Sequence, residues 1–576
     1  MADLILTAGT ILTMDAASNR AEAVAVSDGK IVAVGTLDEA KAALPNAEVV
    51  DTGAAALMPG FVEPHSHPVL SGVSTMPPGH YIAPWVFPTW DDVKTYFAKV
   101  LDENKDNDTP LVFNGFDALL HGTPKPTAPE LDAIFGDRQA FLIDNSGHGV
   151  YFTTAYIKAM GWDVNPPADP VGGSYKRNPD GSLNGQGFEV AAVTAVLIPV
   201  LGKLGGSALV AAAQYYQLMS NAGITSTSEM TFTRSLGPAF SALAQMPSSP
   251  LRVSIWEMST EATTYDQPLE LGVDPDRLVK RGVKLWTDGS PWVGNVAISF
   301  PYLDTPTTQL GGIDGSEAGE QSLNYGRAAL DAALDRVAAG GWSASFHSNG
   351  DIAIDQALDA YERALVEHDL LGTNHGWRLE HVGAGRKDQF ERAARLGVHI
   401  SMGPFQYYYW GHLLDGGMFA PEHGARWQAF HDAFSSGAVV SFHNDGSVSP
   451  PTPILNAQVA VTRQCRAGSV HGPEQAVSID DALRAITINP AHALGRADKV
   501  GSIEVGKLAD FVELNADPYA VDPHQLSTTA TVRGTWLGGV KIDLNQFVSA
   551  VEAADAAQHA AQTKAVHEAH AKKSCC

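Results

Sequence analysis

The sequence predicts an α/β protein whose main part is a (β/α)8 TIM barrel spanning Pro59 to Leu494. Short apolar strands alternate with helical stretches through the second half of the chain, as where residues 283–286 precede a helical pattern over 325–339. Several of these strands end in histidine or are followed by aspartate. Repeated strand–helix units favour a parallel sheet, and a closed barrel carries its reactive groups at the C-terminal ends of its strands.

The helix expected over 325–339 has a regular apolar face. Leu330, Leu334 and Val337 recur at helical spacing, and Gly340 ends the pattern. The units that follow repeat the alternation. Strands are expected at 343–347, 378–382, 398–402 and 439–443, and helices at 352–367, 387–396, 426–434 and 478–494.

Both ends of the chain, residues 1–58 and 495–547, are expected to form β-structure outside the barrel. The first contains short strands at 3–6, 10–13, 23–26 and 31–34, and its Asp28-Gly29 dipeptide suits a tight hairpin because it accepts positive φ. The second contains strands at 509–514, 529–532, 535–537 and 540–542. Neither half has enough strands to bury a sheet alone, so we expect them to join in one small composite β-sandwich.

The predicted barrel, residues 59–494, is longer than the roughly 250 residues of a plain barrel. The excess lies mainly in residues 69–204, where proline, glycine and aromatic residues are dense. We interpret this segment as an inserted subdomain over the barrel mouth. Residues 548–576 are expected to form an Ala-rich helical tail, which either packs on the surface or joins a second subunit in a homodimer or higher homo-oligomer.

Composition limits the possible partners. Hydrophobic residues make up 44% of the 576-residue chain, which is typical of a globular protein. A net charge of −26 argues against nucleic acid and against an anionic membrane surface, and leaves a small molecule as the expected partner. Three cysteines cannot form a disulfide framework, and no basic segment precedes the first apolar residues. These features predict a cytoplasmic protein.

Six polar residues fall where a barrel would place its reactive groups. His65 and His67 follow the apolar strand 57–62, and an i, i+2 pair on a strand points to one side. The other four are Lys284, inside an apolar strand, His347 and His381, each ending a strand, and Asp445, which follows another. A lone buried histidine is usually a hydrogen-bonded core residue, and a lone buried lysine usually snorkels or forms a salt bridge. Several such residues at the ends of separate strands predict a metal site instead.

At these residues the chain resembles the amidohydrolase superfamily, and more closely its branch of N-substituted formamide deformylase-like enzymes. The matching stretches are residues 58–67, 283–290, 347–351, 378–381 and 482–491, the last continuing into 501–510. The resemblance implies two divalent metal ions, usually zinc. His65 and His67 would bind one ion and His347 and His381 the other. Lys284 would carry a CO2-derived carbamate that bridges both ions, and Asp445 would bind a metal and hold the attacking water.

The resemblance also implies a metal-dependent hydrolase acting on carbon–nitrogen bonds other than peptide bonds, with Asp445 as general base and then general acid. His148 aligns with a segment near the substrate and is a candidate donor to the oxyanion, the alternative being a loop-stabilising role. Aromatic residues crowd two loops expected at the barrel mouth. Trp85, Tyr408 and Trp410 are candidate substrate contacts, the alternative being that they pack the inserted subdomain onto the barrel.

The chain departs from the family pattern at three places. Glu63 stands where Asp is common, His443-Asn444 where Gly-Ser is common, and residues 403–410 replace a Gln-Pro-x-His pattern. Two other functions remain open. One is a non-hydrolytic decarboxylase or isomerase on the same ligands, and the other is a non-catalytic barrel that serves as an assembly protein. The second usually loses metal ligands, whereas all six are present here, so the sequence favours catalysis.

Overall fold

The computed structural model describes residues 3–170, 173–261, 264–265, 267–315 and 318–573. Its centre is an eight-stranded sheet in which every neighbouring pair is parallel. In sheet order the strands are β6 (Phe61–Glu63), β13 (Ile224–Phe232), β14 (Arg252–Met258), β15 (Leu278–Trp286), β16 (Ser343–Ser348), β17 (Arg378–His381), β18 (His399–Met402) and β19 (Val440–Phe442).

The sheet closes through a short segment between its two edge strands. Phe442 of β19 donates its backbone N–H to the Ala485 carbonyl (2.8 Å), and Val62 of β6 donates to the Ile486 carbonyl (3.0 Å). The (β/α)8 prediction is confirmed. The single helix expected over 478–494 is instead two, α18 (Ile479–Arg484) and α19 (Ile488–Ala493), because the break between them supplies these two carbonyls.

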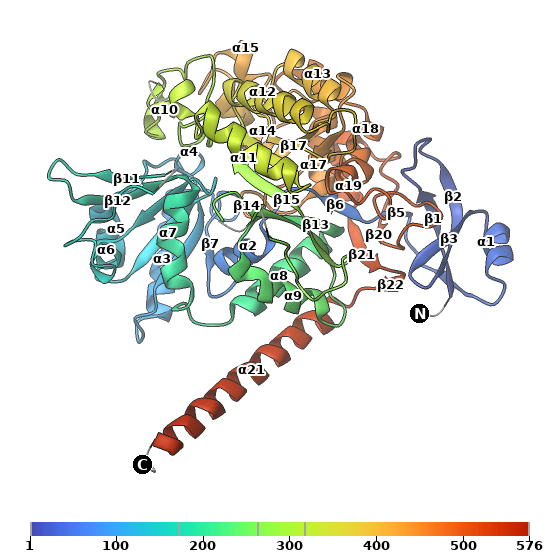
Figure 1. The fold of residues 1–576 in the computed structure, drawn as a ribbon, viewed down its shortest axis with the longest axis horizontal. Coiled ribbons are helices and arrows are strands. Elements are labelled where there is room, and N and C mark those ends of the chain that lie inside the picture. Colours follow the sequence, from blue (N-terminus) through green and yellow to red (C-terminus); the bar gives the residue numbers. More distant parts are fainter. Residues whose placement is uncertain (1–2, 171–172, 262–263, 266, 316–317, 574–576) are drawn as a thin grey trace.

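Helices cover the outside of the barrel (Figure 1). α12 (Asp351–Glu367) buries Ile354, Ala357, Leu358 and Tyr361, which fall on one helical face, while its charged residues face outward. The other barrel helices are α8 (Ala208–Asn221), α9 (Gly237–Gln245), α11 (Arg327–Ala339), α13 (Lys387–Leu396), α14 (Pro404–Leu414), α16 (Phe430–Ser435) and α17 (Pro453–Thr462).

The two ends of the chain share one further sheet. Its order is β22 (Val540–Lys541), β21 (Val532–Leu537), β20 (Phe511–Leu514), β5 (Ala56–Pro59), β1 (Leu4–Leu12), β2 (Arg20–Ser27) and β3 (Lys30–Gly35), with β4 (Glu48–Asp51) on β1 and α1 (Leu37–Ala43) nearby. The expected hairpin forms at Asp28 and Gly29, with φ of 48° and 74°. Ile31 then donates to the Lys507 carbonyl (2.9 Å), so the sheet curls back on itself around a shared core.

A second α/β unit is inserted between β6 and β13. Its mixed sheet runs β11 (Ser174–Arg177), β12 (Leu183–Phe188), β10 (Gly149–Phe152), β9 (Ala140–Asp144), β8 (Leu111–Phe116) and β7 (His80–Tyr81). The accompanying helices are α2 (Pro68–Thr75), α3 (Trp90–Glu103), α4 (Ala118–His121), α5 (Ala128–Phe135), α6 (Thr154–Ala159) and α7 (Glu189–Leu201). We call this unit the inserted subdomain. It and the terminal sheet lie on opposite sides of the barrel (Figure 1).

The chain ends in one long helix, α21 (Leu544–Lys573). Its first turns bury Phe547 and Val551 against the barrel, where Phe547 stacks on Tyr216 of α8. The rest extends away from the body (Figure 1). Among the described residues, no helix is long and apolar enough to cross a membrane.

Candidate metal centre

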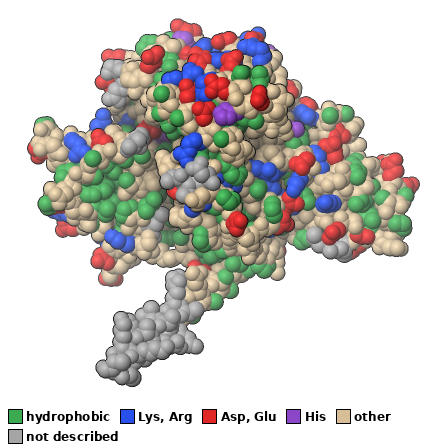
Figure 2. Space-filling model, in the orientation of Figure 1, with side chains coloured by type: hydrophobic (Ala, Val, Ile, Leu, Met, Phe, Trp, Pro, Cys, Tyr) green, Lys and Arg blue, Asp and Glu red, His purple; other side chains and the backbone are tan. Residues whose placement is uncertain are grey.

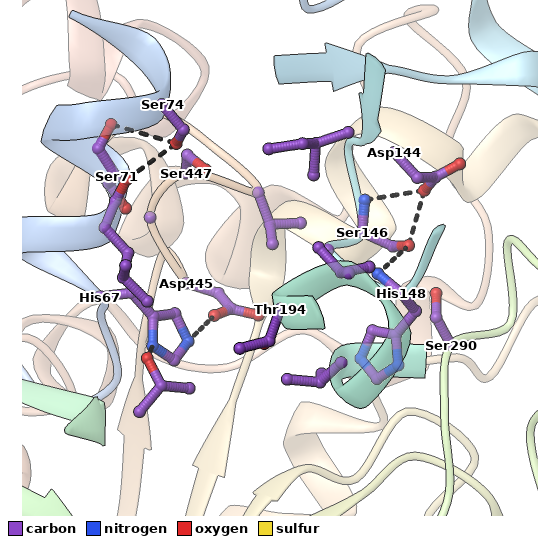
Figure 3. A pocket seen from close by; sticks show the side chains of 18 of the residues that line it. His67, Ser71, Ser74, Asp144, Ser146, His148, Thr194, Ser290, Asp445 and Ser447 are labelled. Carbon is purple, nitrogen blue, oxygen red and sulfur yellow. Dashed lines mark hydrogen bonds and ion pairs between the residues drawn. The ribbon is translucent and has the colours of Figure 1, made fainter. Parts of the chain in front are cut away.

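The structure brings the six predicted ligand residues to one cavity of about 280 Å³ at the C-terminal ends of the barrel strands. His65 and His67 follow β6, Lys284 lies in β15, and Asp445 follows β19. His347 lies in β16 and His381 ends β17. Figure 3 shows His67 and Asp445 facing one another at one side of this cavity.

The first group of ligand atoms is compact. His65 Nε2 lies 3.4 Å from Asp445 Oδ1, and His67 Nε2 lies 3.3 Å from the same oxygen. In the described part of the chain, these three side chains form one of two groups whose ligand atoms all lie within 4.8 Å of one another. Lys284 Nζ is 3.4 Å from His65 Nε2.

The second pair of histidines lies beside the first. The rings of His347 and His381 are 4.4 Å apart, and His381 is 4.8 Å from His65. His347 Nε2 lies 3.0 Å from the Gly289 carbonyl oxygen, which can only accept. A proton on His347 Nε2 would donate to this carbonyl and leave the lone pair of Nδ1 for a metal ion.

Hydrogen bonds behind the first group fix the imidazole orientations. His65 Nδ1 donates to Glu380 Oε2 (2.8 Å), and Glu380 is held by Ser345 Oγ (2.6 Å) and by Arg378. His67 Nδ1 lies 3.0 Å from Thr231 Oγ1. Outer contacts of this kind select the tautomer of a metal-binding histidine and leave the other nitrogen for the ion.

Burial keeps most of these imidazoles neutral. It lowers the pKa of His65, His347 and His381 well below the usual value, and neighbouring cationic groups act in the same direction. Neutral imidazole is the form that binds a metal. Burial also lowers the pKa of Lys284 to about 8, despite the opposing charges of Glu380 and Asp445.

His67 behaves differently because it faces two carboxylates. Burial would lower its pKa, but hydrogen bonds and charges from Asp445 and Glu229 outweigh burial and raise the pKa to about 9. The same interaction holds the pKa of Asp445 below its usual value, although burial acts in the opposite direction. Asp445 is therefore ionised at neutral pH.

Sequence reasoning missed His443 as a member of this site. Its Nε2 lies 3.1 Å from His381 Nδ1, and its Nδ1 lies 2.8 Å from Ser401 Oγ. His65, His381 and His443 form the second group of potential ligands within the described residues. The signal was present, because His443 ends an expected strand as His347 and His381 do, but it was interpreted only as a departure from the family pattern.

His148 reaches the cavity from the inserted subdomain, on the side opposite His67 and Asp445 (Figure 3). Its Nδ1 donates to Glu189 Oε2 (2.8 Å), and the Glu189 backbone N–H donates to the His148 carbonyl (2.9 Å). Burial lowers the pKa of His148, but the charge and hydrogen bond of Glu189 outweigh it and leave that pKa above its usual value. The His148 ring is 5.0 Å from the ring of His347.

The donor set fits a divalent transition metal. It combines the buried neutral imidazoles of His65, His347 and His381 with His67 and with the ionised carboxylate of Asp445. Hydrogen-bond partners already fix the orientation of the His65 and His67 rings. Nitrogen and oxygen ligands of this kind suit zinc and other first-row divalent ions.

Comparison with known proteins shows the family of this chain. A model of the amidohydrolase family matches residues 48–542. The chain belongs to this family. A second model, of a bacterial imidazolonepropionase-like composite domain, matches residues 23–47 of the terminal sheet.

Relatives of this amidohydrolase match it along most of its length. It is 28% identical to the N-substituted formamide deformylase of Arthrobacter pascens, over 94% of this chain and 98% of that protein. It is 25% identical to Protein LONG AFTER FAR-RED 3 of Arabidopsis thaliana, over 94% and 92% of the two chains. An uncharacterized metal-dependent hydrolase from Pyrococcus horikoshii has a similar fold, with a TM-score of 0.69 and 23% identity over 91% of this chain and 99% of that chain.

The aromatic residues predicted to touch substrate lie elsewhere in this amidohydrolase. Among the described residues that line the cavity, none is Trp85, Tyr408 or Trp410. Trp410 is buried, stacks on Trp292 at 4.4 Å and donates to Asp117 (3.0 Å), and Trp85 packs on Tyr409 at 4.3 Å. This geometry supports the packing alternative, because these rings join the inserted subdomain to α14 of the barrel.

The departure at Glu63 has a structural role. Buried Glu63 accepts hydrogen bonds from the Asn444 backbone N–H (3.1 Å) and side-chain Nδ2 (2.7 Å). It therefore holds the residue directly before Asp445. Asp445 itself has a φ of 53°, in the left-handed region that non-glycine residues rarely adopt, so its backbone depends on such anchoring contacts.

Proposed function

We propose that this amidohydrolase hydrolyses an amide-type C–N bond other than a peptide bond. We also propose that its cofactor is a pair of divalent metal ions, namely zinc. The observation that carries the proposal is the convergence of His65, His67 and Asp445 with a second histidine pair around Lys284, at the floor of a single cavity. The deformylase relative, named for a formamide bond, supports the choice of bond.

In this proposal His65, His67 and Asp445 hold one ion, and His347 and His381 hold the second. When bound, divalent ions lower the pKa of coordinated water to roughly 7 and polarise a carbonyl group. Lys284 lies between the two sets as a carbamate. Its lowered pKa favours the neutral amine, the form that reacts with CO2, and the product replaces a costly buried cation by an anion.

Asp445 carries the proton in the proposed reaction. It is ionised and 9% exposed, so it accepts a proton from the attacking water and delivers it to the leaving nitrogen. His148 stabilises the carbonyl oxygen as negative charge develops. Because Glu189 holds Nδ1 and favours the protonated ring, Nε2 of His148 also keeps a proton and donates.

The domain limits at residues 58, 494 and 547, a homodimer and a cytoplasmic location stay predictions from the sequence. A decarboxylase or isomerase would use the same ligands, and substrate tests separate these reactions from hydrolysis. The complete set of donors at the cavity floor argues against a non-catalytic assembly protein.

Metal content and turnover test the proposal together. We would measure metal per chain on purified protein, and hydrolysis of a panel of N-formyl and N-acyl amines before and after chelation. We expect about two ions per chain and activity that chelation removes and added metal restores. One ion per chain would refute the carbamate at Lys284, and a metal-loaded chain inactive on the whole panel would refute the amide assignment.

A further inference from the structure

Helix α7 (Glu189–Leu201) of the inserted subdomain has two apolar faces. One face packs into the subdomain core through Ala192, Val196 and Val200. The other lines the cavity at positions i, i+3, i+4, i+7 and i+8, namely Val190, Val193, Thr194, Leu197 and Ile198. Val193 and Leu197 also contact this core, whereas Val190 and Ile198 lie outside it among the described residues, so packing within the subdomain does not explain these two apolar side chains.

The cavity face of α7 leads from the predicted ligands to the surface. Ile198 lines the cavity and is also 58% exposed, so it stands at the opening. Thr194, one turn earlier, lies between His67 and His148 in Figure 3. Leu236, which follows β13, and Met258, the last residue of β14, line the same cavity. Figure 2 shows hydrophobic side chains gathered on the inserted subdomain, in the region where Figure 1 places α7.

Charge in the cavity is confined to its floor and one wall. Among the described lining residues, Lys284 is the one lysine or arginine, and it lies against His65. Asp144 also lines the cavity, and its carboxylate accepts from Ser146 Oγ (2.6 Å) and Tyr151 (3.1 Å). His148 and His67 are the other groups that can carry positive charge, and both lie toward the predicted ligands rather than toward Ile198. A carboxylate on the outer part of a substrate would therefore meet no cation along Leu197 and Ile198, and burying an unpaired charge is costly.

We propose that the substrate is an uncharged amide with one extended apolar arm, which lies along the cavity face of α7 and points toward Ile198. Thr194 and Leu197 determine specificity for this arm. The inference rests on the proposed amide hydrolysis, and it excludes N-acyl amino acids and other substrates with a carboxylate on the arm.

Two substrate series test the length dependence. N-alkylformamides place the arm on nitrogen, and N-methyl alkanamides place it on the carbonyl carbon. In one series kcat/KM should rise about fourfold per methylene, the factor for burying a CH2 group, until the arm reaches solvent at Ile198. Analogues with a carboxylate at the end of an arm too short to reach Ile198 should be at least 100-fold poorer. Rates that do not rise with length in either series, or equal rates for the carboxylate analogues, would overturn the inference.

Neighbouring positions on α7 supply a matched pair of variants. Thr194→Asp puts a charge on the cavity face and should lower the ratio of long-arm to short-arm kcat/KM at least tenfold. Ala195→Asp puts the same charge on the next residue, which does not line the cavity, and should leave both rates unchanged. Equal effects of the two variants would overturn the role of Thr194.

Binding separates failure of this inference from failure of the proposed reaction. Trp286 and Trp292 line the cavity, so their fluorescence reports occupancy without turnover. If short formamides are hydrolysed but length has no effect, the inference fails and the proposed function stands. If nothing is hydrolysed, the proposed function fails, and the fluorescence titration still decides whether an apolar arm binds more tightly with each methylene.

Discussion

Replacing Gly446 by alanine would disturb the proposed catalytic carboxylate through a steric contact. A methyl group at Gly446 would lie 1.9 Å from the Tyr215 hydroxyl oxygen and 3.0 Å from its Cζ. Tyr215 is 3% exposed within the barrel core, so it cannot turn aside into solvent. Overpacking of this kind costs about 1–3 kcal/mol. Because Asp445 is the preceding residue, we expect a shift of its carboxylate and about a 100-fold loss of kcat/KM.

Removing the tyrosine oxygen supplies the control. In Gly446→Ala/Tyr215→Phe the closest contact becomes the 3.0 Å contact to Cζ, so part of the strain is relieved. We expect the double variant to be at least tenfold more active than Gly446→Ala, a coupling of about 1.4 kcal/mol. The assay is kcat/KM on an accepted amide, with thermal unfolding of all four chains. The reasoning is refuted if Gly446→Ala keeps wild-type activity, or if Tyr215→Phe restores none of what it loses.

Three further predictions test the site and the fold. Asp445→Asn should remove turnover while metal content stays within a factor of two of the wild type, and retained activity would contradict the proton-transfer role. Lys284→Met, which keeps an unbranched side chain but no amine, should lower metal content from about two ions to about one, and an unchanged ion count would exclude the bridging carbamate. Burial lowers the pKa of His121 to about 4, so between about pH 6.5 and pH 4 this side chain is protonated in the unfolded chain but not in the folded chain. The contribution of His121 should therefore lower the free energy of unfolding by about 3 kcal/mol as pH drops from 6.5 to 4. In urea titrations at these two pH values, the free energy of unfolding of His121→Gln should fall less than that of the wild type.

The barrel could be predicted from the sequence because apolar residues recur with a different spacing in its helices than in its strands. The expected helix over 387–396 agrees with α13 residue for residue, and the expected strand over 343–347 agrees with β16 to within one residue. The prediction failed where tertiary contacts override local pattern. Strands expected at 3–6 and 10–13 are one strand, β1, with an irregularity between Thr7 and Ile11, because both parts pair with β2.

The sequence indicates where strands end, and this pointed to the predicted ligands. It does not indicate which residues support those ligands through hydrogen bonds. Glu380 reaches His65 across the barrel interior, from a strand that is not a sheet neighbour of β6. That contact depends on barrel closure, which places side chains from separate strands in one layer. Likewise, the sequence left two roles open for Trp410, substrate contact and packing, and its stacking on Trp292 favours packing.

The barrel and the inserted subdomain contribute different properties to the cavity. The proposed metal ligands come from β15, β16, β17 and the residues after β6 and β19, where strand hydrogen bonds fix their positions. His148 and the cavity face of α7 come from the inserted subdomain, where α7 packs on β10, β11 and β12. A change on the cavity face of α7 can therefore alter which amide fits without moving a ligand, whereas a change at Glu380 alters the orientation of His65 for every substrate. On the proposed function, the barrel thus supplies the metal ligands, whereas the inserted subdomain supplies the oxyanion donor His148 and the face of α7 that contacts the substrate arm.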